Sequence, residues 1–340
     1  MPETYNIFSS NNAVIDQIKG ESTQFQSIAT EVSNVIVGQQ AILDHILIGI
    51  LCNGHILLEG VPGVAKTTII KAFAKALGLQ FNRIQFTPDL LPADVVGTLV
   101  YNQKTNEFET KKGPIFANLV LADEINRAPA KVQSALLEAM QEQQVTIGSN
   151  TFLLDHPFLV FATQNPIEQE GTYRLPEAQV DRFMFKLNVH YPTKAEEREL
   201  VRRTLDISSL KQIITAADIH KAQQLVQEVF VDEKIVEYIV NIVFATRDAH
   251  PELKPYIECG VSPRATLALF HAAKAHAFLK RRHFVTPDDV KAIAPSVLRH
   301  RIMLTYQAEA ENITSDILIQ KIIHMIPSPL DVFALDKKSR

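Results

Sequence analysis

The stretch Gly60-Val61-Pro62-Gly63-Val64-Ala65-Lys66-Thr67 decides the fold. It follows the short apolar segment 55–58, which predicts a buried strand, and it opens the segment 67–77, whose apolar spacing predicts a helix. A glycine-containing turn in this context can present backbone N–H groups to a phosphate, while Lys66 reaches the phosphate oxygens and the Thr67 hydroxyl ligates Mg²⁺. The stretch therefore predicts a phosphate-binding loop. The alternative is an ordinary strand-to-helix turn with an exposed lysine.

This loop pattern needs support from the rest of the chain, because glycine, lysine and threonine at relaxed spacing also arise by chance. Ala65 stands where the usual pattern has glycine before the lysine. The candidates for contacting the nucleotide are residues 60–68, which include Thr68.

A second apolar strand, expected over 119–123, ends in the adjacent carboxylates Asp123 and Glu124. Parallel sheets bind ligands at the carboxyl ends of their strands, so these acids are expected beside the loop. Asp123 can hold the water shell of a metal, and Glu124 can polarise an attacking water as a general base. Two acids that close a strand commonly mark only a solvated turn, but their position downstream of Lys66 favours nucleotide hydrolysis.

Three further polar side chains are candidates for the same chemistry. Asn165 ends the next expected strand, 158–163, where an amide could reach a γ-phosphate and the attacking water, although Asn-Pro is also a common turn. Arg182 and Arg264 lie at expected helix boundaries, from which a guanidinium could stabilise charge on a γ-phosphoryl group. A surface salt bridge is the alternative for either arginine.

The order of expected elements predicts two domains. A βαβ unit ends in the strand 81–85, an irregular insertion occupies 88–112, and a β-hairpin is expected over 144–154. From about residue 192 the pattern is helical. We therefore expect a partly flexible helical segment over 1–34, an α/β core with a parallel sheet over 35–191, and a smaller α-helical domain over 192–335.

Composition narrows the possible partners and surroundings. The 340-residue chain has a formal charge of −4 and a pI near 6.3, which disfavours wrapping of nucleic acid by phosphate neutralisation and favours protein partners. The two cysteines, Cys52 and Cys259, show no paired spacing. Neither a signal peptide nor an apolar stretch long enough for membrane insertion is apparent, so a cytoplasmic protein is expected.

Several strings of the sequence together resemble one known family. Residues 60–67, Leu-Ala-Asp-Glu-Ile-Asn-Arg-Ala-Pro at 121–129 and Ala-Thr-Gln-Asn-Pro at 162–166 are similar to the MoxR family of AAA+ ATPases, in which alanine before the lysine also occurs. The resemblance extends over about residues 35–305.

The resemblance implies a P-loop NTPase core of the AAA+ type, with a parallel sheet flanked by helices and followed by an α-helical lid. Segment 88–112 would be the helix-two insert and 144–154 the pre-sensor hairpin. The implied roles are Walker A for Lys66 and Thr67, Walker B for Asp123 and Glu124, first sensor for Asn165, an arginine finger acting in trans for Arg182, and second sensor for Arg264. Arg174 stands where the family pattern has proline, so it competes with Arg182 for the trans role.

By the same resemblance the chain would bind ATP with Mg²⁺ and hydrolyse it as a subunit of a ring, expected to be a hexamer. Its expected work is chaperone-like remodelling or maturation of protein complexes, with a von Willebrand factor A domain protein as a possible client. Two alternatives stay open: a ring motor driven by nucleic acid, and a nucleotide-gated scaffold with negligible turnover.

Overall fold

The computed structural model of the chain describes residues 12–61, 63–165, 173, 175–202 and 206–329. Contacts within the chain divide it into two compact units. The core unit comprises residues 28–216, and the second unit joins the chain up to residue 27 with the chain from residue 217 onward. Helix α1 (Asn12–Ser33) therefore begins in the second unit and ends in the core unit.

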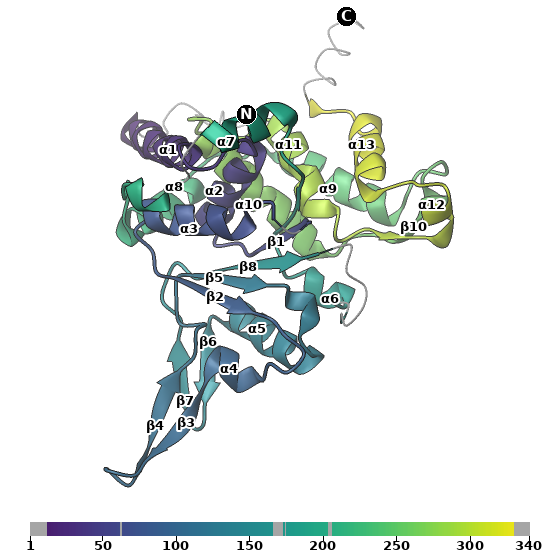
Figure 1. Cartoon of the computed structure of the whole chain (residues 1–340). Helices are drawn as coiled ribbons and strands as arrows, with labels where there is room; N and C mark the ends of the chain where they lie inside the picture. The colour runs from purple at the N-terminus through teal and green to yellow at the C-terminus, as the bar shows by residue number, and fades with distance from the viewer. Residues whose placement is uncertain (1–11, 62, 166–172, 174, 203–205, 330–340) are drawn as a thin grey trace, which may run out of the picture. The chain divides into compact units, whose positions relative to one another are not determined.

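A parallel five-stranded sheet forms the centre of the core unit, as the sequence predicts (Figure 1). Its order is β2-β5-β8-β1-β9, with every neighbouring pair parallel. The inner strands are runs of buried apolar residues because helices cover both faces of the sheet. The strands are β1 (Ile56–Gly60), β2 (Phe81–Gln85), β5 (Leu119–Asp123), β8 (Leu159–Gln164) and β9 (Phe185–Val189).

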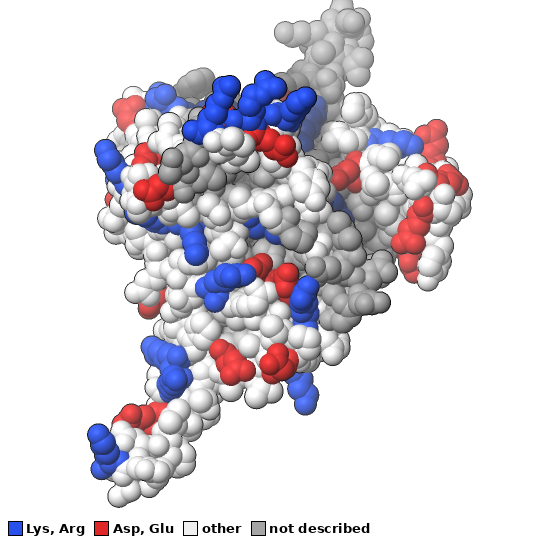
Figure 2. Space-filling model, in the orientation of Figure 1, with Lys and Arg blue, Asp and Glu red and all other residues white. Residues whose placement is uncertain are grey.

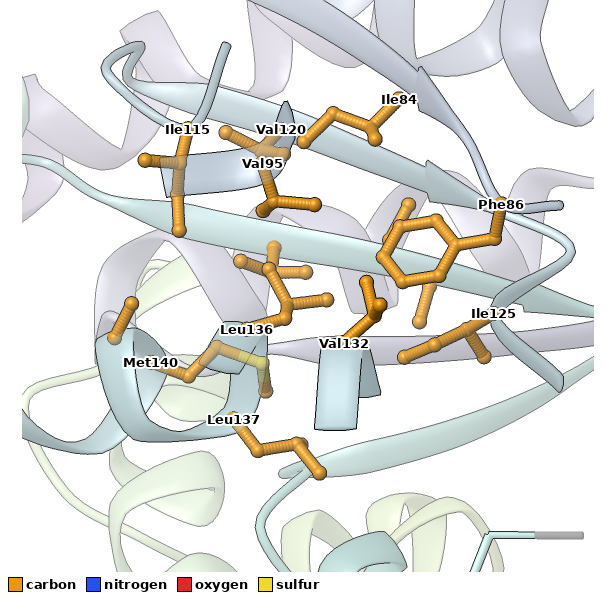
Figure 3. Close-up of a cluster of buried hydrophobic side chains, with 14 of the residues drawn as sticks. Ile84, Phe86, Val95, Ile115, Val120, Ile125, Val132, Leu136, Leu137 and Met140 are labelled. Atoms are coloured by element: carbon orange, nitrogen blue, oxygen red, sulfur yellow. The ribbon is translucent and has the colours of Figure 1, made fainter. Parts of the chain in front are cut away.

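Helices pack on the two faces of this sheet. In Figure 1, α2 (Gln40–Cys52) and α3 (Lys66–Ala76) lie above the sheet and α5 (Ala130–Glu142) lies below it. Val132, Leu136 and Met140 are four residues apart and therefore lie on one face of α5. Figure 3 shows that this face packs against buried side chains of the sheet. Other helical elements of the unit are η1 (Ile125–Arg127), α6 (Glu177–Val180), α7 (Lys194–Arg202) and η2 (Ile207–Ser209).

Segment 88–112 is not irregular, which corrects the interpretation of its sequence. It forms α4 (Pro92–Val96) and an antiparallel hairpin of β3 (Gly97–Asn102) and β4 (Glu107–Lys112), which projects beside the hairpin of β6 (Gln144–Ile147) and β7 (Asn150–Leu153) (Figure 1). Most residues of β3 and β4 are exposed on both faces, so their sequence lacks the alternation that marks a half-buried strand.

The second unit is mainly helical and includes the first part of α1. Phe25 of α1 packs edge-on against Phe278 with 6.0 Å between ring centroids, and Gln26 Nε2 donates a 2.8 Å hydrogen bond to the Leu279 carbonyl. This division differs from the boundaries expected at residues 34 and 191. The other elements are α8 (Ala216–Gln227), α9 (Glu233–Arg247), η3 (Lys254–Tyr256), β10 (Ile257–Cys259), α10 (Pro263–Leu279), α11 (Pro287–Leu298), β11 (Met303–Leu304), α12 (Tyr306–Ala310) and α13 (Ser315–Met325).

A buried carboxylate joins α10 to α11 in this unit. Asp289, fully buried, accepts hydrogen bonds from Arg282 Nη1 at 2.7 Å and from the Thr286 backbone at 2.7 Å, and it lies 2.6 Å from His276 Nδ1. Burial raises the pKa of Asp289, but these hydrogen bonds outweigh burial and hold the pKa of the carboxyl well below its usual range.

None of the helices in the described part of the chain combines the length and the apolar character that a membrane span requires.

Candidate active site

The loop between β1 and α3 bends sharply at two of its described residues. Gly63 and Ala65 adopt left-handed conformations, with φ of 83° and 60°, and α3 begins at Lys66. The Lys66 ammonium donates a 2.6 Å hydrogen bond back to the Gly60 carbonyl, so the lysine side chain lies over the loop that precedes it. Pro62 lies outside the described residues, and Thr67 and Thr68 occupy the first turn of α3.

Lys66 lies within the electrostatic reach of the acid pair. Burial lowers the pKa of the Lys66 ammonium, while the charges of Asp123, Glu124 and Glu59 act in the opposite direction. Glu59, the residue before Gly60, also forms a 2.8 Å ion pair with Lys186 of the neighbouring strand β9. The structure therefore brings together the lysine and the two acids that the sequence predicts.

Thr163 fixes the acid pair from the adjacent strand β8. Its hydroxyl donates a 2.6 Å hydrogen bond to Asp123 Oδ1 and accepts a 2.8 Å hydrogen bond from the backbone N–H of Glu124. The Thr163 side chain is buried, and Glu124 turns away from the strand with a left-handed φ of 57°. The backbone consequently turns sharply between the two acids.

Three side chains complete the surroundings of the acids. Arg83 donates to Asp123 Oδ2 through both Nε, at 2.9 Å, and Nη2, at 2.6 Å. Gln85 Nε2 donates to Glu124 Oε2 at 2.8 Å, and Arg127 Nε forms an ion pair with the same oxygen at 3.1 Å. Each acid is thus held on a defined side by donors.

Asn165 and the turn after Glu124 lie close to these strand ends in the chain. Asn165 follows β8 directly and is buried, with 7% of its surface exposed. The turn Ile125–Arg127 is held by the buried amide of Gln133, which donates to the carbonyls of Ile125, at 3.2 Å, and Ala128, at 3.1 Å. Asn165 therefore lies at the end of the strand beside β5, and Gln133 fixes the turn that follows Glu124.

The two candidate arginines have different surroundings. Arg182 follows α6 closely, and it donates from Nε to Gln141 Oε1 at 3.1 Å and from Nη1 to the Ala178 carbonyl at 3.3 Å. Arg264 belongs to the second unit, where it is exposed in the first turn of α10 and its backbone N–H is capped by Ser262. Arg174 lies outside the described residues.

The donor set at this edge suits Mg²⁺. Thr67 supplies a hydroxyl and Asp123 a carboxylate, which are hard oxygen ligands, and Mg²⁺ typically takes few protein ligands while keeping waters and phosphate oxygens. Among the described residues, no group of three or more His, Cys, Asp or Glu side chains is placed to hold a metal ion.

Sequence reasoning missed Thr163, Arg83 and Gln85 as parts of the site. A signal for Gln85 was present, because it ends its strand as Asp123 ends the next one in the sheet, and the two pair directly in the register of β2 with β5. Arg83 lies two residues earlier and therefore on the same face of the strand. Thr163 could not be found without knowing that β8 lies beside β5.

Comparisons with known proteins agree with this architecture. The family described as "ATPase family associated with various cellular activities (AAA)" matches residues 55–185, and the "AAA lid domain" matches residues 252–322. A crystal structure of a candidate ATPase from Cytophaga hutchinsonii superposes with a TM-score of 0.86 at 48% identity, covering 92% of this chain and 97% of that chain. The fold and the site thus define an ATPase of the AAA+ class with a lid.

Curated relatives narrow the class further. Chaperone MoxR1 of Mycobacterium tuberculosis is 50% identical over 304 residues, which cover 88% of this chain and 81% of the relative. Protein MoxR of Methylorubrum extorquens is 29% identical over 323 residues, covering 88% of this chain and 93% of the relative. The chain belongs to the MoxR family of AAA+ ATPases, which confirms the resemblance found in the sequence.

Proposed function

We propose that the protein binds ATP with Mg²⁺ and hydrolyses it, and that it uses the cycle to remodel or mature protein complexes. One observation carries the hydrolytic part: β1, which leads into the loop of Lys66, and β5, which ends at Asp123, both pair with β8, so the loop and the acids lie at the same carboxyl edge of the sheet. The remodelling part is supported by the word chaperone in the name of the 50% identical relative. A cytoplasmic location fits this work.

The proposed roles follow from the positions of the side chains. Residues 60–68 would cradle the phosphates, Thr67 and Asp123 would hold Mg²⁺, and Mg²⁺ would neutralise the phosphate oxygens. Glu124, turned away from β5, would take the proton of the attacking water, and Asn165 would orient that water. These steps would use residues of the core unit, whereas Arg264, the proposed second sensor, belongs to the second unit.

Assembly into a ring, expected to be hexameric, is part of the proposal because Arg182 would complete the nucleotide site of a neighbouring subunit. A ligand whose site gains contacts only in the assembly must favour assembly by mass action. Sedimentation should therefore show ATP with Mg²⁺ promoting self-association more than ADP does. A von Willebrand factor A domain protein is the client class to test first, and a Glu124→Gln variant that retains ATP is the bait.

The core experiment separates binding from hydrolysis. Lys66→Ala should weaken ATP binding because it removes the cation that faces the phosphates, whereas Glu124→Gln should bind ATP and fail to turn it over. Lys71→Ala is the matched control, because Lys71 is exposed on the same helix α3. Parental turnover by Glu124→Gln would refute the general-base role.

Nucleic-acid stimulation tests the alternative motor function. Figure 2 shows side chains of both charges along the hairpins β3–β4 and β6–β7. Strand β4 by itself contributes Glu107, Glu109, Lys111 and Lys112. Such mixed charge favours a protein partner over a phosphate backbone. We expect the ATPase rate to be unchanged by added DNA or RNA at low and moderate salt; strong stimulation that salt abolishes would favour the motor.

A further inference from the structure

A third acid, Glu59, lies beside the phosphate loop, in addition to the two acids proposed for hydrolysis. Glu59 directly precedes Gly60, whose carbonyl accepts the 2.6 Å hydrogen bond from the Lys66 ammonium. The bond lengths along this path keep the ammonium within about 9 Å of the Glu59 Cα atom. The negative charge of Glu59 acts against the burial that lowers the pKa of Lys66. A free carboxylate at position 59 would therefore compete with phosphate for the lysine.

Lys186 of the neighbouring strand β9 holds this carboxylate. Its ammonium lies 2.8 Å from Glu59 Oε2, and the side chains of Lys186 and Glu59 are only 22% and 27% exposed. Strand β9 packs closely on the end of β1, since Gly60 pairs with Val189 and a Cβ atom added at Gly60 would lie 2.5 Å from the Val189 carbonyl oxygen. The ion pair is therefore built into the sheet just before the loop begins.

Each of the three acids whose charges act on Lys66 is paired with a cation. The pairs are Asp123 with Arg83, Glu124 with Arg127, and Glu59 with Lys186. These pairs balance one negative charge with one positive charge each, so the charge of Lys66 is left for the phosphates. The first two acids would serve the metal and the attacking water in the proposed cycle, whereas the third needs only to be neutralised.

We propose that Lys186 is a positioning residue for nucleotide binding, which holds Glu59 on β9 and balances its charge so that the Lys66 ammonium stays available to the phosphates. The inference rests on the proposed function, since it requires nucleotide at the loop. An unbalanced Glu59 would attract Lys66 and repel the phosphates, and both effects weaken binding. Lys186 acts through Glu59 and needs no contact with the nucleotide.

The test measures the dissociation constant of a fluorescent, slowly hydrolysed ATP analogue in the presence of Mg²⁺. Lys186→Met should weaken binding roughly three- to tenfold, because it leaves a partly buried negative charge unbalanced near the phosphates. Added salt should reduce this loss, since dissolved ions screen the free charge. Lys186→Arg keeps the charge and should bind nearly as the parent does. Lys71→Met removes an exposed positive charge from α3 and is the matched control, which should stay parental.

Glu59→Gln distinguishes charge balance from a structural role of the ion pair. Combined with Lys186→Met it removes both charges, so the double variant should bind the analogue nearly as tightly as the parent. Glu59→Gln alone should bind at least as tightly as the parent. If both of these variants bind as weakly as Lys186→Met, the pair only supports the sheet and the inference is overturned. Lys186→Gln, which keeps a hydrogen-bond donor without the charge, should also bind weakly and replaces Lys186→Met if that variant does not fold.

Lys66→Ala separates this inference from the proposed function. If the parent and Lys66→Ala bind the analogue equally well, the loop is not the phosphate site, and the proposed function falls together with the inference. If Lys66→Ala weakens binding while Lys186→Met and Lys186→Gln stay parental, the inference alone is overturned.

Discussion

The hydroxyl of Thr163 donates to the carboxylate of Asp123 at 2.6 Å while the rest of its strand lies buried in the sheet. The same oxygen accepts the backbone N–H of Glu124, so one side chain fixes both the carboxylate proposed for the metal and the backbone that aims the proposed base. A hydroxyl is suited to this double contact because it donates and accepts at once.

Thr163→Val should therefore impair catalysis more than folding. Valine keeps the shape of threonine but leaves Asp123 Oδ1 and the Glu124 N–H without this partner, and loss of such a supporting contact typically costs ~10–100-fold in activity. Steady-state ATPase kinetics would measure the loss in kcat. Thr163→Ser retains the hydroxyl and should stay close to parental; equal kcat in the valine variant would mean that the contact does not position the acids.

Arg182→Ala should nearly silence the ATPase while sparing nucleotide binding, because arginine fingers contribute ~10³–10⁵ in rate. Mixing Arg182→Ala with Lys66→Ala should restore part of the activity, since some interfaces then pair an intact loop with an intact arginine. If the mixture assembles in sedimentation yet stays inactive, Arg182 does not act in trans or every site in the ring must be intact. Arg174→Ala, run in parallel, tests the competing arginine.

Stability of the core unit should fall as pH drops from 6.5 toward 4, because His55 is buried as a neutral ring. His55 Nδ1 accepts the Val160 N–H at 3.0 Å, and Nε2 lies 3.0 Å from the Met140 carbonyl, which fixes the tautomer. Burial lowers the pKa of His55 to about 4. The unfolded chain, with an ordinary histidine pKa near 6.5, binds more protons in this range, so the ring contributes about 2 kcal/mol less stability at pH 5 than at pH 7.5.

Urea unfolding at pH 7.5 and pH 5 would measure this dependence. His55→Gln should show a smaller pH effect than the parent, because the titrating group is gone. His190→Gln, an exposed substitution just after β9, should keep the parental effect. An undiminished pH effect in His55→Gln would assign the dependence to other groups.

Asp289→Asn should destabilise the second unit by about 1–3 kcal/mol, because the fully buried amide cannot accept all the hydrogen bonds that Arg282 and Thr286 donate to the carboxylate. Asp288→Asn is a neighbouring control, since the Asp288 side chain is 84% exposed and surface substitutions usually change stability by less than about 0.5 kcal/mol. Thermal unfolding of both variants would show the difference. Equal unfolding temperatures would mean that the buried network adds no net stability.

The local hydrophobic pattern predicted helices and strands best where they are buried on one face or on all sides. The bounds of β2 and β5 agree with the sequence prediction, because apolar runs mark these strands directly. The hairpin of β3 and β4 escaped prediction since its residues are exposed on both faces. The attachment of α1 rests on contacts such as Gln26 with Leu279, 253 residues apart, which no local pattern encodes.

The residues of the candidate site also differ in whether local sequence pattern could predict them. Lys66, Asp123 and Glu124 could be predicted because each occupies a characteristic place at a strand end or helix start. Arg83 and Thr163 could not, because their importance depends on which strands pair and in what register, whereas the strand-end position of Gln85 was a signal that went unused. The side chains proposed to perform the chemistry belong to recognisable sequence motifs. The side chains that position them come from neighbouring strands that are distant in the sequence.

The left-handed backbone of Ala65 bears on the rigidity of the loop before any nucleotide arrives. Alanine at φ 60° is strained relative to glycine by roughly 1 kcal/mol. Glycine would in return widen the range of shapes that the empty loop samples. A loop that samples few conformations loses less conformational entropy when it closes around its ligand. The methyl group of Ala65 therefore lowers the stability of the loop slightly and favours ligand binding.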